Sequence, residues 1–145
     1  MLAPLGHPVF RWIWIASLFT NLGWLIQGVG AAWIMTELTS KAGLVAMVQT
    51  AQMGPSLLLA IAAGAIADMY DRRKVALVGI SVSLTGATAL AALSFGDLVT
   101  PAVLLIGCAL IGTGGALMGP AWQASVREQV PAALLPAAIT LNRIS

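Results

Sequence analysis

Gly64-Ala65-Ile66-Ala67-Asp68-Met69-Tyr70-Asp71-Arg72-Arg73-Lys74 is the most highly charged segment of this sequence. It carries five of the chain's twelve acidic and basic side chains, and long apolar runs without any formal charge lie on both sides of it. Charges are costly inside a bilayer, so the charges of a membrane protein collect in the loops between its spans. The segment therefore predicts a short polar loop between two membrane-spanning helices.

The composition places the chain among integral membrane proteins. Only 8% of its 145 residues are charged and 59% are hydrophobic, and the mean hydropathy is +0.95. A soluble domain carries about 25% charged residues, so this chain has too little polar surface to cover a soluble fold. A net charge of +2 with no basic stripe argues against a nucleic-acid partner. The single cysteine, Cys108, lies in an apolar run and is expected to fill space between packed helices.

Four charge-free runs are long enough to cross a membrane. Because a helix rises about 1.5 Å per residue, about 20 apolar residues span a hydrocarbon core of about 30 Å. Met1 to Phe10 is expected to be a leader too broken for a helix, and the runs are too continuously apolar for the strands of a barrel. The predicted fold is an all-α membrane protein, a transmembrane helix bundle with four full spans plus the start of a fifth at about residue 134. The spans are expected at about residues 12–36, 42–67, 75–96 and 98–126.

The basic residues predict the side of the membrane that each loop faces. If the spans alternate in direction, Arg11, the Arg72–Lys74 cluster and Arg127 fall on one side, and Lys41 falls on the other. Basic residues favour the cytoplasmic side. The N-terminus and the Gly64–Lys74 loop are therefore expected in the cytoplasm, and the chain is expected to be a multi-pass protein of the cell (inner) membrane.

Small residues recur at four-residue spacing inside the spans, which places them on one helix face and lets neighbouring helices approach closely. Gly112-Thr113-Gly114-Gly115 is denser in glycine than one such face requires, and with Pro120 it is expected to let the fourth helix bend. Pro55 is expected to kink the second. The small residues are Ala60 and Gly64, then Gly79, Ser83, Ala87 and Ala91, and finally Cys108, Gly112, Ala116, Gly115 and Gly119.

A few uncharged polar side chains also lie within the spans, where an amide must find a hydrogen-bond partner or a watery cavity. Hydrogen bonds between helices are one interpretation, and the lining of a substrate pathway is the other. The pathway candidates are Asn21, Gln27, Gln49, Gln52, Thr113 and Gln123.

The sequence holds no catalytic constellation. Its one histidine, His7, lies in the leader, and Asp68 and Asp97 fall at opposite faces of the membrane. Neither a metal cluster nor an intramembrane carboxylate pair is therefore available. No glycine-rich phosphate loop followed by Lys-Ser or Lys-Thr occurs. No enzyme activity, metal or cofactor is expected.

The charged loop resembles the signature loop of the major facilitator superfamily, G-x-L-A-D-R-x-G-R-R, in Gly64, Ile66, Ala67, Asp68, Arg72 and Arg73. Other segments resemble one branch of that superfamily, the transmembrane secretion effector or enterobactin-exporter-like group of bacterial efflux carriers. The resemblance covers nearly the whole chain from about Phe10 onward. The segments are Asp71–Lys74, Gly119–Ala124, Val130–Pro131, Leu134–Pro136 and Ala138–Asn142.

The chain departs from this pattern at two loop positions. Met69 stands where the signature has a basic residue, and Asp71 stands where it has a glycine, which adopts positive φ readily. Asp71 either takes up that backbone conformation or caps the third helix. In the fourth run the sequence lacks the arginine of many proton-coupled relatives, so the resemblance does not extend to proton coupling through that residue.

The resemblance implies transport by alternating access, in which two six-helix halves rock about a site at the membrane midplane. An ion gradient would drive the cycle. Asp68 would meet the N-terminus of a helix in the other half, where the dipole favours an anion, and Arg72 and Arg73 would form cytoplasmic salt bridges. The expected gating loop is therefore Gly64, Asp68, Asp71, Arg72 and Arg73; the alternative is that these charges only set the topology.

The chain breaks off early in its fifth helix, so residues 1–145 are expected to be the N-terminal part of a major facilitator exporter, inactive alone. The expected partners are the lipid bilayer, a small-molecule substrate and the missing C-terminal half of the transporter. The alternative is a small four-helix membrane protein that assembles with itself or with a partner and has no transport activity.

Overall fold

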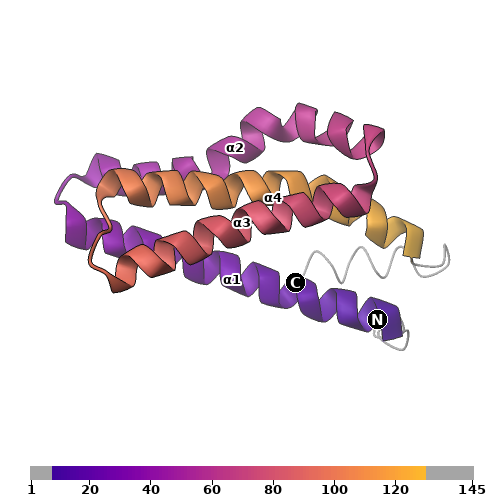
Figure 1. The fold of residues 1–145 in the computed structure, drawn as a ribbon, viewed down its shortest axis with the longest axis horizontal. Helices are drawn as coiled ribbons and strands as arrows, with labels where there is room; N and C mark the ends of the chain where they lie inside the picture. The colour runs from indigo at the N-terminus through magenta and orange to yellow at the C-terminus, as the bar shows by residue number, and fades with distance from the viewer. Residues whose placement is uncertain (1–7, 130–145) are drawn as a thin grey trace. The chain divides into compact units, whose positions relative to one another are not determined.

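The computed structural model describes residues 8–129, with the side chains of all of them except 8–10, 13, 60–68, 72 and 121–129. Within these residues every regular element is a helix: α1 is Pro8–Leu38, α2 is Ala42–Met69, α3 is Arg72–Phe95 and α4 is Pro101–Gln129 (Figure 1). The chain divides into two compact units. One is residues 28–122, and the other combines the two ends of the chain, residues 1–27 and 123–145.

All four helices contain a segment long and apolar enough to cross a membrane. This confirms the predicted all-α membrane protein with four full spans. The predicted start of a fifth span, at about residue 134, lies outside the described residues. The four apolar segments are Trp14–Leu38, Ala42–Leu59, Arg73–Phe95 and Pro101–Pro120.

The first helix begins earlier than the sequence predicts. Pro8, Val9 and Phe10 belong to α1, so the expectation of a non-helical leader is wrong for these three residues. The physical reason is that proline has a φ suited to the first helical turn, where its missing N–H would have no partner within the helix.

The fourth helix begins at Pro101, a few residues after the start of its charge-free run. Thr100 precedes the helix and caps it: its Oγ1 accepts a hydrogen bond from Val103 N at 3.3 Å, and its carbonyl accepts one from Leu104 N at 2.9 Å. A threonine cap followed by proline is a common way for a helix to begin.

Two backbone hydrogen bonds connect the turn between α3 and α4 to the last residues of α3. Leu98 N donates to Leu93 O at 3.0 Å and Asp97 N donates to Ser94 O at 3.3 Å, the two bonds of a Schellman motif. The left-handed residue of this motif is Asp97, with φ 53°, whereas Gly96 has φ −95°. Of the described residues other than glycine, Asp97 alone has positive φ.

Proline 55 lies inside α2, which continues to Met69. The ribbon of α2 changes direction partway along its length (Figure 1), as expected for a helix in which proline removes one backbone hydrogen bond. The helix as a whole is not broken, because the remaining bonds hold on both sides.

The hydrophobic core of residues 28–122 is formed by the second part of α1, by α2 and by α4. Among the four helices, α4 buries the largest share of its apolar segment. Its Cys108 is fully buried, which agrees with the packing role predicted for this residue. The core residues are Ala31, Met35, Val48, Leu104 and Cys108.

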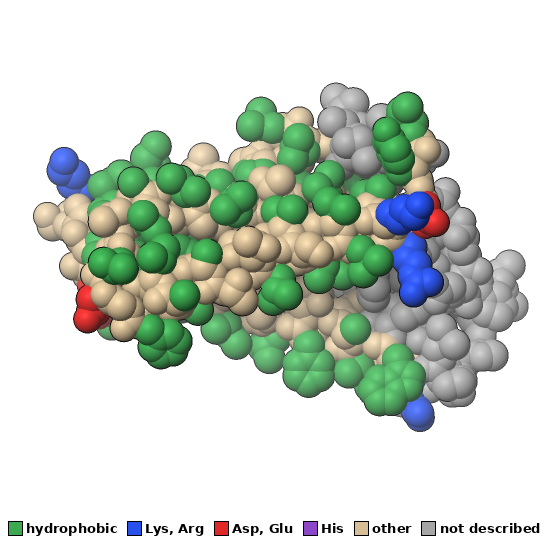
Figure 2. All heavy atoms as spheres, viewed as in Figure 1, with side chains coloured by type: hydrophobic (Ala, Val, Ile, Leu, Met, Phe, Trp, Pro, Cys, Tyr) green, Lys and Arg blue, Asp and Glu red, His purple; other side chains and the backbone are tan. Residues whose placement is uncertain are grey.

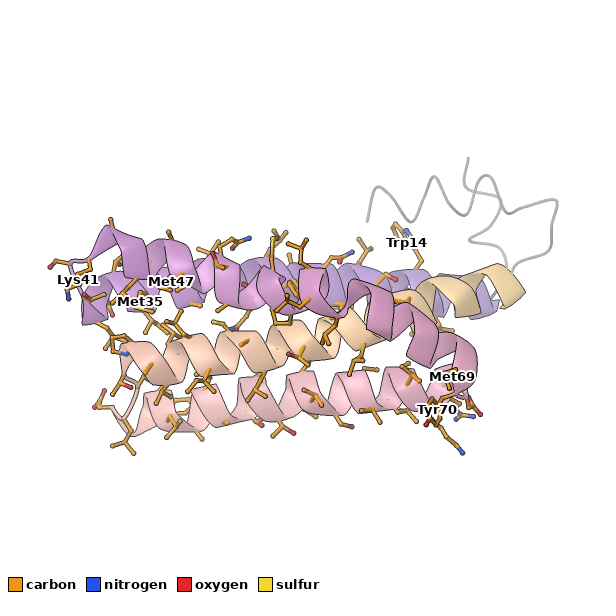
Figure 3. All side chains as sticks on the ribbon, turned by 90° about the horizontal axis from the view of Figure 1, so that it is seen from above. Trp14, Met35, Lys41, Met47, Met69 and Tyr70 are labelled. Carbon is orange, nitrogen blue, oxygen red and sulfur yellow. The ribbon has the colours of Figure 1, made fainter. Side chains whose placement is uncertain are left out.

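Helices α3 and α4 lie side by side (Figures 1 and 3) and approach through small residues. A Cβ atom at Gly114 would collide with the carbonyl of Gly79 and with Ser83. Ser83 Oγ crosses the contact and donates to the Ile111 carbonyl at 3.1 Å. The predicted close approach is therefore confirmed at Gly79 and Ser83, whereas Ala91, at the far end of the predicted row, is exposed.

Candidate functional site

The loop between α2 and α3 consists of Tyr70 and Asp71. Both residues are exposed, and in Figure 3 Met69 and Tyr70 lie at the end of the 28–122 unit opposite Lys41. Figure 2 shows basic and acidic side chains at the ends of the helices, with an apolar surface between them on this face. Tyr70 and Asp71 therefore lie outside the segments able to cross a membrane, and Arg73 and Lys74 stand at the start of one of them.

Asp71 caps α3. Its Oδ1 accepts a hydrogen bond from Arg73 N at 2.9 Å, and its carbonyl accepts from Lys74 N at 2.9 Å and Val75 N at 3.1 Å. Its φ is −56°, so of the two roles predicted for this residue the structure shows the cap and not the positive-φ turn. A carboxylate at this position also interacts favourably with the positive end of the helix dipole.

The other predicted loop residues are placed only in part. Arg73 and Lys74 are exposed in the first turn of α3. Gly64 and Asp68 belong to the last turns of α2 and Arg72 begins α3, but the side chains of Asp68 and Arg72 lie outside the described ones. The salt bridges expected of Arg72 and Arg73 stay a prediction.

The candidate pathway residues are divided between the two units of the chain. Asn21 is exposed and Gln27 is half-buried, both in the unit formed by the ends of the chain. Gln49 of α2 is exposed, and its Nε2 donates to the Met53 sulfur at 3.4 Å. The side chain of Gln123, near the end of α4, lies outside the described ones.

Gln52 differs from the other amides because its side chain is 2% exposed. Its Oε1 lies beside Gly28 of α1, 3.5 Å from where a Cβ would stand. Its Nε2 is buried and has no hydrogen-bond partner. Its backbone carbonyl lies so close to Gly112 of α4 that a Cβ there would collide with it. Three helices therefore meet at this glutamine.

Thr113 follows Gly112 on α4 and is half-buried. Its hydroxyl donates to the carbonyl of Ala109, one turn earlier in the same helix, at 2.8 Å. Of the candidate pathway residues in the 28–122 unit, Gln52 thus belongs to the contact between α2 and α4, and Gln49 is exposed on α2.

Sequence reasoning missed several residues of these contacts. Gly107 and Gly114 face α3, where a Cβ would collide with Leu90 or with Ser83, and Gly28 faces Gln52. A spacing of seven residues, like a spacing of four, returns to the same helix face, so Gly107 and Gly114 could have been found from their spacing. Nothing in the sequence singles out Gly28.

The glycine-rich segment of α4 serves two faces. Gly112 faces α2 and Gly114 faces α3, which accounts for a glycine density greater than one contact requires.

Among the residues that the structure describes, no three His, Cys, Asp or Glu side chains lie close enough together to hold a metal ion.

Comparison with known proteins agrees with this architecture. The family model described as transmembrane secretion effector matches residues 1–145. The multidrug efflux pumps Tap of Mycobacterium tuberculosis (strain ATCC 25618 / H37Rv) and Mycobacterium bovis (strain BCG / Pasteur 1173P2) are 28% identical over 141 residues, which is 95% of this chain and 32% of each pump. The chain therefore spans about a third of the length of these relatives. No solved structure matches it significantly.

The family match covers the whole chain, and the four apolar helices are those of a multi-pass membrane protein. The chain therefore belongs to the transmembrane secretion effector family of the major facilitator superfamily of transporters.

Proposed function

We propose that this chain is the N-terminal part of an efflux carrier that exports a small molecule by alternating access, driven by an ion gradient. The observation that carries the proposal is the match of the transmembrane secretion effector model to all 145 residues. The relatives named multidrug efflux pumps support the direction of transport. In such carriers two halves rock about a site near the middle of the membrane.

The exposed amide of Gln49 supports a carrier larger than these four helices. Gln49 lies well inside an apolar span and its side chain faces outward, with one hydrogen bond to a thioether sulfur. An amide has two N–H donors and a carbonyl acceptor, and leaving them unpaired against lipid is costly. Further helices, or a watery cavity between two halves, would satisfy this side chain. The remainder of the carrier is therefore proposed as the partner of this chain.

The substrate is proposed to be an uncharged or amphipathic small molecule. The pathway candidates in the spans are amides and a hydroxyl, and these spans carry no formal charge. Polar but uncharged side chains on apolar walls suit a solute with a large apolar surface and a few hydrogen-bonding groups.

The charged loop is proposed to gate the carrier from the cytoplasmic side of the cell membrane. Asp68 lies two positions before Tyr70 and would bind the N-terminus of a helix in the other half. The cap formed by Asp71 starts α3 directly after the loop, so Arg72 and Arg73 in the first turn of α3 would be available for salt bridges.

A dye-efflux assay in proteoliposomes with an imposed proton gradient tests the proposal. The 145-residue chain alone is expected to move no dye, and the longer protein that contains it is expected to export an amphipathic fluorescent dye. Asp68→Asn in the longer protein should lower the efflux rate at least tenfold, while Lys41→Gln, a change in a loop on the other side, should leave it unchanged. Equal insertion of both variants into the membrane is the control.

Two results would contradict the proposal. Dye efflux by the 145-residue chain alone would show that it needs no second half. If the longer protein exports none of the amphipathic dyes in a panel, the alternative of an assembly protein without transport is favoured.

A further inference from the structure

Trp33 and Glu37 form an exposed pair of side chains in the last turns of α1. The indole Nε1 of Trp33 donates a hydrogen bond to Glu37 Oε1 at 3.0 Å. Trp33 is 67% exposed, and Glu37 is exposed as well. This bond uses the N–H edge of the indole and not the faces of the ring, and the carboxylate keeps lone pairs that can accept further hydrogen bonds.

The end of α1 is an unfavourable place for a carboxylate. The helix ends at Leu38, and no basic residue lies in its last turn. The C-terminal end of a helix carries a partial negative charge, so a cation stabilises it and an anion destabilises it. Among the described residues, Trp33 is the partner of the Glu37 side chain, so Lys41 in the following turn does not pair with it. A bound cation would interact favourably with both the carboxylate and the helix end.

The Trp33–Glu37 pair lies at the depth of lipid headgroups. The segment of α1 able to cross a membrane is Trp14–Leu38, so the pair occupies its last two turns. Tryptophan is enriched at this depth because its ring is apolar and its N–H is polar. The carboxylate of Glu37 therefore stands beside the polar groups of lipids and not beside the ends of their acyl chains.

An exposed apolar face of α1 leads to the pair from deeper in the span. Val29 precedes Trp33 by four positions and Glu37 follows it by four, so the three residues share one helix face. Val29 is 70% exposed, and a Cβ at Gly30 would have nothing within 4 Å. An apolar face that ends in an indole and a carboxylate complements a molecule with acyl chains and an ammonium headgroup.

We propose that the Trp33–Glu37 pair binds the ammonium group of an ethanolamine phospholipid, whose acyl chains lie along the face of α1 that contains Val29. Glu37 accepts a hydrogen bond from the ammonium N–H, and the indole ring contacts the same cation. The bond from Trp33 holds the carboxylate beside the ring, so both side chains act on one headgroup. Binding of this lipid goes beyond the proposed function and does not depend on transport.

Native mass spectrometry of the 145-residue chain in detergent measures this binding. Phosphatidylethanolamine and phosphatidylglycerol with the same acyl chains are offered together, and the ratio of their association constants is recorded. Glu37→Gln is expected to lower this ratio about fivefold, the size of one exposed ion pair with a cation–π contact. Trp33→Leu should lower it as well. The double variant should fall short of the product of the two single effects, because both side chains act on one headgroup.

Two matched controls belong to the same experiment. Asp97→Asn removes another exposed carboxylate, at the same end of the 28–122 unit (Figure 1), and asparagine tolerates the left-handed backbone of this position. Trp12→Leu removes a tryptophan that is 66% exposed and has no acidic residue near it in α1. Both variants should keep the wild-type ratio.

The proposal is overturned if Glu37→Gln leaves the ratio unchanged, or if Asp97→Asn lowers it equally, since net charge would then explain the effect. It is also overturned if Glu37→Gln weakens binding of an amphipathic cationic dye and not of phosphatidylethanolamine, because the pair would then serve a substrate. Circular dichroism checks that each variant keeps its helices; if Trp33→Leu does not, Glu37→Gln with its control decides the question.

The same ratio is then measured on the longer protein that contains this chain. Glu37→Gln is expected to lower it there too. Loss of the effect in the longer protein would show that the remainder of the carrier covers this face of α1, and would overturn the lipid site. Dye efflux by the longer protein reports separately on the proposed function, so either idea can fail without the other.

Discussion

Gly112 of α4 lies directly against the backbone carbonyl of Gln52 in α2, with no room between them for a side chain. At this point α4 and α2 are in contact backbone to backbone. Gly112→Ala would force the helices apart, because its Cβ would meet backbone atoms that cannot turn aside as a side chain can.

We expect Gly112→Ala to lower the free energy of unfolding by about 1–3 kcal/mol, the usual cost of overpacking. Gly30→Ala in α1 is the matched control, since a Cβ there has nothing within 4 Å. It should raise stability by about 0.5–1 kcal/mol, because alanine favours a helix over glycine. Denaturation in mixed detergent micelles, followed by circular dichroism, measures both, and equal effects of the two variants would contradict the assigned contact.

The interhelical bond from Ser83 Oγ to the Ile111 carbonyl should stabilise the α3–α4 pair. Its length is 3.1 Å, and such bonds in membrane proteins contribute about 0.6 kcal/mol on average. Ser83→Ala is expected to cost about that amount in the same unfolding assay. Ser81→Ala is the control, because the Ser81 hydroxyl donates to Leu77 in its own helix; a larger loss from Ser81→Ala than from Ser83→Ala would argue against the interhelical bond.

Two substitutions of Asp71 separate the contribution of its capping hydrogen bond to stability from the contribution of its charge. Asp71→Ala removes the acceptor for Arg73 N and should lower stability by about 0.5–2 kcal/mol. Asp71→Asn keeps a capping oxygen without the charge and should lose much less. Thermal unfolding of the two variants in micelles makes the comparison, and an asparagine variant as unstable as the alanine one would assign the effect to the charge.

Asp97 occupies the left-handed position of the α3–α4 turn, with φ 53°. Asp97→Val should destabilise the turn by about 1–2 kcal/mol, because a β-branched residue fits this conformation poorly. Asp97→Gly should retain or raise stability, since glycine adopts positive φ without steric cost. Protease cleavage between α3 and α4, timed in micelles, reports on the turn; cleavage of the glycine variant faster than of the valine variant would contradict this account.

Much of the fold could be predicted from the sequence because its causes are local. The cost of placing charges in hydrocarbon confines them to loops, so the runs around Asp68–Lys74 predict four spans that the structure confirms. The cap at Asp71 is also local, since the acceptor and the donor of Arg73 lie two positions apart. The early start of α1 at Pro8 was missed, because proline was counted as a helix breaker although it suits the first turn.

The tertiary structure alone decided which face of each helix is packed. Gln49 and Gln52 are the same residue type in the same apolar span, yet one is exposed and the other is 2% exposed. A span that is apolar on all sides carries no hydrophobic periodicity to mark its buried face, because lipid is as apolar as the protein interior. Faces are then chosen by close packing against neighbours, and Gly28, Gly107 and Gly114 acquire their roles only from the helices opposite them.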